Sequence, residues 1–238
     1  MTALLVALVL AVDPSLEVSA SAPSRTPLEV GLSSVPQLGL VQVDGRAGLS
    51  ERFTLELGGW NVFGSNTAGA YLRGGLLGGE YDVLHSDVLD MTAGLRVFGV
   101  QAAAGASASA GLSARVATSI RGLSFLTVKP DFELGWLGDA GNFRFANELA
   151  FALGEWTLGA SGGVQGWVVS GGDLSVAPAA ALRVGVRHDF GPVALDVSGV
   201  LAVARDASFI TRTPVMAMPT QDVGFQAGLR VAIISTSR

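Results

Sequence analysis

The chain of 238 residues contains no cysteine, which excludes disulfide bonds, thiolate catalysis and cysteine-based zinc sites. It has two histidines, and its fifteen basic residues include a single lysine, Lys129. The net charge of −5 gives no basic surface of the kind that nucleic acid requires. We therefore expect no nucleic-acid partner, and the sequence offers no cofactor or metal site.

Long apolar blocks are also missing. The chain is 49% hydrophobic, with a mean hydropathy of +0.48, and this is high for a soluble domain. A membrane-spanning helix needs about 20 consecutive apolar residues, whereas the longest uncharged runs, such as 97–114, are rich in alanine, glycine and serine. A helical membrane protein is therefore the least supported of the three protein classes considered.

Residues 143–153 show an alternation that only Asn147 interrupts. Phenylalanine and leucine fall on one parity, and charged residues or alanine fall on the other. A period of two turns successive side chains to opposite faces of a strand. The pattern recurs from about Leu28 to Ile234, and repeated strands with one apolar and one polar face are typical of membrane-spanning β-barrels.

We predict an all-β fold, an antiparallel up-and-down transmembrane β-barrel of about twelve strands, with ten as the alternative. The alternation predicts strands at 28–35, 38–48, 53–63, 68–79, 88–100, 108–120, 123–137, 143–153, 156–169, 174–188, 193–204 and 223–233. Barrels of this type have short turns at one end and long loops at the other. The longest predicted connection, 205–220, falls opposite most of the short links, and only the link 80–87 is longer than expected at the turn end.

The first residues predict export. Residues 2–12 form an apolar run of the length of a signal-peptide core, and Ala20-Ser21-Ala22 is a candidate cleavage site. We predict a signal peptide at 1–22 and a single barrel domain at 23–238. The alternative is that the apolar run is a short buried strand or helix.

Nearly every mid-strand charge falls on the polar parity, which predicts a charged barrel interior. An arginine facing lipid at mid-depth would cost about 2–4 kcal/mol, so this segregation is expected. A water-filled lumen and an ion-paired plug both remain open. The residues predicted to line the lumen are Asp44, Arg46, Glu56, Arg73, Arg96, Arg115, Lys129, Asp131, Glu133, Arg144, Glu148, Arg183, Arg187, Asp196 and Arg230.

Aromatic residues near the predicted strand ends suggest two girdles at the membrane interfaces. The alternative is that aromatic residues flank turns in any β-protein. The predicted girdle consists of Phe53, Phe125, Trp136, Phe143, Trp156 and Phe225.

Catalytic motifs are absent. His85-Ser86-Asp87 contains the residue types of a triad, but triad members must converge in space rather than follow one another. Asp131 and Glu133 point the same way, but with Lys129 beside them a lumenal ion-pair network is favoured over a metal site or a carboxylate pair. We expect no enzyme activity.

Two segments resemble hairpins of bacterial outer-membrane β-barrel proteins. Residues 46–58 read as a strand ending in Gly-Leu-Ser, an acidic-Arg turn and a new alternating strand, and 188–192 is similar to another of their short turns. The resemblance implies a bacterial outer-membrane location, contact with the lipid bilayer, and the outer-membrane assembly machinery as a partner. The expected function is a passive narrow pore for small polar solutes or a structural surface barrel. The alternative is a secreted soluble β-sandwich or solenoid that acts as an adhesive or binding module.

Overall fold

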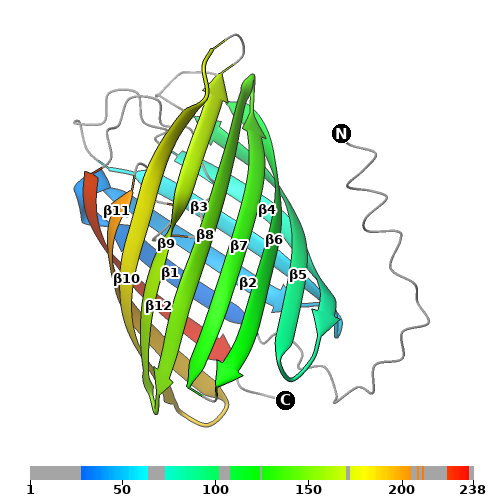
Figure 1. Ribbon diagram of the computed structural model, residues 1–238, viewed down its shortest axis with the longest axis vertical. Coiled ribbons are helices and arrows are strands. Elements are labelled where there is room, and N and C mark those ends of the chain that lie inside the picture. The colour runs from blue at the N-terminus through cyan, green and yellow to red at the C-terminus, as the bar shows by residue number, and fades with distance from the viewer. Residues whose placement is uncertain are drawn as a thin grey trace.

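A closed β-barrel contains all strands of the described part of the chain (Figure 1). The computed structural model describes residues 28–63, 73–101, 108–123, 125–169, 172–204, 208, 211 and 224–235. Each strand pairs antiparallel with its sequence neighbours, and β1 (Glu29–Val35) pairs with β12 (Gly224–Ser235) to close the sheet. The predicted up-and-down barrel of twelve strands is thus confirmed, and the ten-stranded, sandwich, solenoid and helical alternatives are wrong.

The ten strands between these two lie in simple sequence order around the barrel. They are β2 (Leu40–Gly48), β3 (Phe53–Val62), β4 (Arg73–His85), β5 (Leu89–Gln101), β6 (Ser109–Leu123), β7 (Leu126–Leu137), β8 (Ala140–Leu153), β9 (Trp156–Val169), β10 (Ser175–Asp189) and β11 (Val193–Ala204). A short 3-10 turn, η1 (Pro36–Leu38), joins β1 to β2. Among the described residues, no helix is long and apolar enough to cross a membrane.

The two ends of the barrel differ in their connections. The lower end in Figure 1, which we call the turn end, carries the short links 49–52, 86–88, 124–125, 154–155 and 190–192. The opposite loop end carries the longer links 63–72, 102–108 and 205–223. Gly154 and Gly191 have φ of 63° and 80°, a conformation that L side chains rarely adopt, so these two turns depend on glycine. The predicted signal peptide, 1–22, lies outside the described residues and stays a prediction.

Strand β4 corrects one predicted element. The sequence predicted a strand at 68–79, whereas β4 begins at Arg73 and continues to His85. Leu76 therefore faces the interior and Leu77 the exterior, which is opposite to the phase that would turn Arg73 toward the lumen as predicted. The predicted phase was wrong because two adjacent leucines and four nearby glycines leave no clear alternation in this stretch. The corrected strand also shortens the following link to 86–88, which removes the long turn at the turn end.

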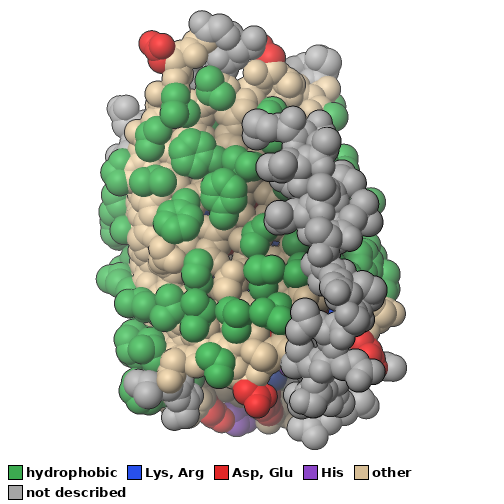
Figure 2. Space-filling view, turned by 45° about the vertical axis from the view of Figure 1, so that its right-hand side comes forward, with side chains coloured by type: hydrophobic (Ala, Val, Ile, Leu, Met, Phe, Trp, Pro, Cys, Tyr) green, Lys and Arg blue, Asp and Glu red, His purple; other side chains and the backbone are tan. Residues whose placement is uncertain are grey.

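The outer wall is apolar. Valine, leucine, isoleucine and phenylalanine side chains are exposed on every strand, and Figure 2 shows hydrophobic side chains over the wall with acidic ones near its two ends. Within the described strands, the ionisable side chains at outward positions are Arg73 and Tyr81 on β4 and His188 on β10, all outside the middle third of the wall. Such a surface suits hydrocarbon rather than water.

The interior changes in character along the barrel. Toward the loop end, inward positions hold buried apolar side chains, most of which form one cluster, while Trp167 and Ala177 form a second, smaller one. The larger members of the first cluster are Val35, Leu40, Trp60, Val62, Leu76, Phe98, Val100 and Leu137. Strands β10 and β11 contribute only small or β-branched residues to it, namely Ala179, Ala181, Val200, Ala202 and Ala204. The middle and the turn end hold the charged residues instead.

Candidate functional site: the charged lumen

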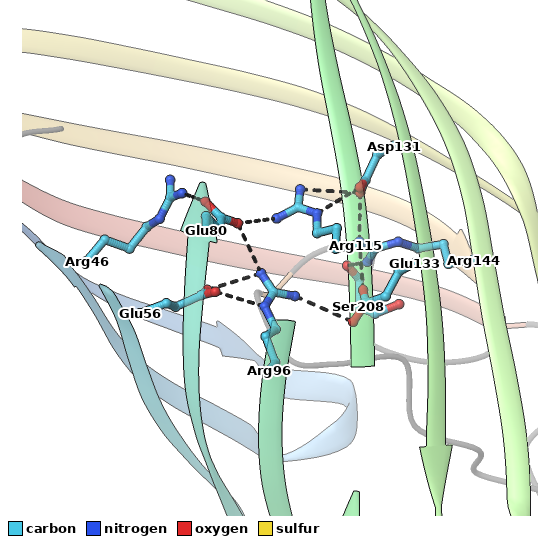
Figure 3. Close-up of polar contacts among 9 residues, drawn as sticks. All are labelled: Arg46, Glu56, Glu80, Arg96, Arg115, Asp131, Glu133, Arg144 and Ser208. Carbon is cyan, nitrogen blue, oxygen red and sulfur yellow. Dashed lines mark hydrogen bonds and ion pairs between the residues drawn. The ribbon is translucent and has the colours of Figure 1, made fainter. Parts of the chain in front are cut away.

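Seven consecutive strands, β2 to β8, deliver charged side chains to one network inside the barrel (Figure 3). Each strand places its alternate residues inward, so one or two charges from each strand reach the same side of the lumen. The network balances four arginines against four carboxylates: Arg46, Arg96, Arg115, Arg144, Glu56, Glu80, Asp131 and Glu133.

Arg96 is the centre of this network. Its Nε and Nη2 donate to the two carboxylate oxygens of Glu56 at 2.8 and 3.2 Å. The same guanidinium lies 3.8 Å from Glu80 and 3.5 Å from Glu133. Arg96 and Glu56 are both buried, so the pair is desolvated and its geometry has to be good for the charges to be tolerated. A paired guanidinium and carboxylate of this kind fix each other in position.

Asp131 joins two more arginines to the network. Arg115 Nε donates to Asp131 at 2.7 Å, and Arg144 Nη2 donates to its other oxygen at 2.7 Å. Arg144 also lies 3.2 Å from the fully buried Glu133. A planar guanidinium presents several donors in fixed directions, which explains why arginine rather than lysine occupies these bridging positions.

Ser208, from the connection between β11 and β12, also lies inside the barrel. Its carbonyl accepts from Arg144 Nη1 at 2.8 Å, and its hydroxyl accepts from Gln165 Nε2 at 3.0 Å. Both Ser208 and Thr211 are buried. These two residues therefore occupy part of the lumen at the level of the network.

A second cluster lies at the seam where the barrel closes. Arg230 on β12 donates to both carboxylate oxygens of Asp44 at 2.6 and 2.8 Å. It also donates to Glu29 at 2.9 Å and to the Ser33 hydroxyl at 3.0 Å. The arginine thus links the last strand to both β1 and β2 across the closing seam.

A cavity of about 350 Å³ lies between the network and the opposite wall. That wall is built of small residues on β9 and β10, including Gly159, Ser161 and Ala181. Lys129, Glu148 and Arg183 also line the cavity, and in the described part of the chain none of the three forms an ion pair. The cavity is therefore polar, with charges of both signs at its surface.

Most residues predicted to line the lumen do face the interior. Twelve lie in the two clusters or at the cavity, including Asp44, which accepts hydrogen bonds from Arg230. Asp196 and Arg187 are paired across β10 and β11 at inward positions near the turn end, where Arg187 is exposed and donates to Asp189 at 3.2 Å. Arg73 is the error: it lies at an outward position at the loop end of β4 and donates to Gln101. The prediction failed there because the phase of the strand was wrong.

Glu80 is the member of the network that the sequence reasoning missed. It contacts Arg46, Arg96 and Arg115, yet it was placed in a turn. The alternation of Glu80, Tyr81 and Asp82 was the signal that the strand continues. Among the uncharged inward residues, Gln42, Ser113 and Gln165 lie on the face that the alternation predicts. Ser33 and Asn142 were missed, since a serine fits either face of a strand and Asn142 precedes the predicted strand 143–153.

The six aromatic residues of the predicted girdle lie at the two ends of the wall. Trp136, Phe143 and Phe225 belong to the loop ends of their strands, and Phe53, Phe125 and Trp156 lie at the turn end. All are exposed except Phe143, whose ring covers Gly166 of the adjacent strand. Their role at a membrane interface stays a prediction.

The histidines and nearby polar groups form no catalytic array in the described structure. The Ser86 hydroxyl forms hydrogen bonds with the backbone of Leu89. His85 Nδ1 lies 2.7 Å from Asp90 Oδ1, so the ring contacts Asp90 and not the Ser86 hydroxyl. His188 contacts Glu155 at the exposed turn end. Among the described residues, no group of three or more histidine or acidic side chains could hold a metal ion.

Comparison with known proteins identifies the fold and no closer relationship. No protein-family model matches the chain, and no curated protein matches its sequence. Solved structures that are similar include "KdgM porin", with a TM-score of 0.56 and 9% identity over 89% of this chain and 99% of that one. The structure named "KdgM porin in complex with disordered oligogalacturonate" has a TM-score of 0.55 and 9% identity, and the match again covers 89% of this chain and 99% of that one. A NanC porin has a TM-score of 0.55 and 9% identity, and the match covers 88% of this chain and 100% of that one. The chain therefore shares the fold of these porins over nearly their whole length.

Proposed function

We propose that the chain is a barrel of the bacterial outer membrane that lets small polar solutes pass through a narrow lumen. One observation carries the proposal: the charged side chains are enclosed and border a polar cavity, while the wall around them is apolar. In a soluble protein this arrangement would be inverted, because the charged face would meet water on the outside. Such a barrel would reach the membrane through the outer-membrane assembly machinery.

The similar structures support the same kind of solute. They are named as porins, and one of them is a complex with oligogalacturonate, a polar carbohydrate. The cavity of this chain offers hydroxyl groups and charges of both signs, which suit small hydrated molecules rather than apolar ones. The proposal assigns passive passage to this chain and no catalytic step.

Planar-bilayer recording of the refolded protein tests the proposal. We expect discrete current steps above background, smaller than those of a wide porin, because arginine side chains and Ser208 occupy much of the lumen. Leakage of sugars of graded size from proteoliposomes would then give the size limit. Silent bilayers and tight liposomes, with a correctly folded protein, would refute a pore.

A closed structural barrel is the second candidate. It is favoured by the buried apolar cluster toward the loop end, where Trp60 and Phe98 are almost completely shielded from solvent. If the barrel is sealed there, truncating these rings should create conductance in a protein that has none. The wild-type recording therefore separates the two candidates directly.

A further inference from the structure

The inner face of the barrel is rich in glycine at positions where the backbone does not require it. Of the described glycines, those with positive φ are Gly39, Gly138, Gly154 and Gly191, and all four lie in turns. A glycine inside a strand weakens it relative to alanine, because more backbone entropy is lost on folding. The inner glycines therefore need another explanation.

Long side chains from neighbouring strands occupy the space above several of these glycines. A Cβ atom at Gly159 would lie 2.7 Å from Glu148 Oε1, and a Cβ atom at Gly135 would lie 2.5 Å from Asn142 Oδ1. The same is true of Gly31 under the Arg230 guanidinium. Two aromatic rings toward the loop end are held likewise, Trp60 over Gly74 and Phe98 over Gly111. In each case a large lumenal side chain lies along the wall instead of projecting across the lumen.

Outward glycines of β5, β9 and β11 show the contrast. A Cβ atom at Gly99, Gly162 or Gly199 would have no heavy atom within 4 Å. On the outer wall, side chains cover a glycine chiefly where an aromatic ring lies against it, as Phe143 does over Gly166. The close fit of glycine and long polar side chain thus belongs to the lumen.

We propose that the inner glycines hold the long lumenal side chains against the wall and so set the width and the charge of the passage. This inference rests on the proposed pore function. Gly159 is its sharpest case, because it lines the cavity on the wall opposite the arginine network. Alanine at this position would displace the Glu148 carboxylate by roughly 1 Å, since ordinary contacts need about 3.5–4 Å. The displaced carboxylate would move into the cavity.

Single-channel recording of Gly159→Ala tests the effect on the passage. We expect a smaller current and, in a salt gradient, a reversal potential shifted toward cation preference, because a negative group enters the path of the ions. The matched control is Gly162→Ala on the same strand, which faces outward with open space around it and should conduct like the wild type. Heat-modifiable gel migration checks that each variant is folded.

The double variant Gly159→Ala with Glu148→Ala shows whether the effect runs through Glu148. Compared with Glu148→Ala alone, it should show no further loss of current, because the side chain that the methyl group displaces is gone. An equal loss in both backgrounds would overturn the proposal.

A second measurement does not depend on conductance. Because the chain has no cysteine, Ala181→Cys introduces a unique thiol at the cavity and leaves Glu148 intact. A negatively charged, water-soluble thiol reagent should modify it several-fold more slowly when residue 159 is alanine than when it is glycine, because the displaced Glu148 carboxylate repels the reagent. Equal rates would refute the role of Gly159 even in a conducting barrel. A silent wild type with unequal rates would refute the pore and leave the positioning by Gly159 intact.

Discussion

Arg230 should be the residue on which closure of the barrel depends most. Replacing it with methionine keeps a flexible, unbranched side chain, although a shorter one, and removes four hydrogen bonds, two to Asp44, one to Glu29 and one to Ser33. Breaking a buried ion pair by removing one partner typically costs about 3–5 kcal/mol. We expect a loss of this size in the free energy of unfolding, measured by urea titration of the protein in lipid vesicles with tryptophan fluorescence.

Arg230→Lys should fall between the wild type and Arg230→Met, since lysine keeps the charge but cannot donate to both oxygens of Asp44 in the same fork geometry. Arg187→Met is the matched control, because Arg187 is exposed and, among the described residues, its side chain forms a single ion pair, with Asp189. An exposed pair of this kind contributes at most about 1 kcal/mol. The reasoning is refuted if Arg230→Met loses no more stability than Arg187→Met.

Three further predictions concern the wall, the network and the loop end. Phe145→Arg places a cation in the middle of the outer wall and should destabilise the membrane-inserted barrel by about 2–4 kcal/mol. Phe225→Arg, near a strand end, should cost about 0–1 kcal/mol of the same stability. Equal losses in the free energy of unfolding in vesicles would contradict a lipid-facing wall. Arg96→Met should lower stability and shift the reversal potential toward cations, because Glu56 loses its bidentate partner; an unchanged potential would show that ions do not pass the network. Trp60→Ala should lower the free energy of unfolding by about 3–5 kcal/mol and raise the single-channel current. An unchanged current would place the narrowest point of the lumen away from Trp60.

Alternation alone predicted the barrel, because side chains that face lipid have to be apolar, and this requirement is visible in the order of neighbouring residues. An arginine cannot face hydrocarbon cheaply, so inward parity is readable wherever a charge and a large apolar residue alternate, as they do from Arg144 to Leu149. In β4 this signal fails: Gly74, Gly75, Gly78 and Gly79 carry no polarity. Both Arg73 and Glu80 were misplaced for that one reason.

The partners within the lumen could not be predicted from the same pattern. Parity says that Arg96 and Glu56 face inward, but it does not say that the two meet, because their contact depends on the stagger of strands far apart in sequence. The position of Ser208 inside the barrel depends on the path of a long connection, for which alternation provides no information. The glycines under long side chains likewise become meaningful only once the pairing of strands is known.

Spin labels scanned along β8 test the central claim most directly, namely that odd positions touch acyl chains and even positions line an enclosed interior. Single cysteines at Phe145, Ala146, Glu148 and Leu149 would carry the labels in a chain that otherwise lacks thiols. In reconstituted vesicles, labels at 145 and 149 should be relaxed strongly by oxygen and weakly by a polar nickel complex, and labels at 146 and 148 should show the opposite order. The same relaxation by the nickel complex at all four positions would contradict the account.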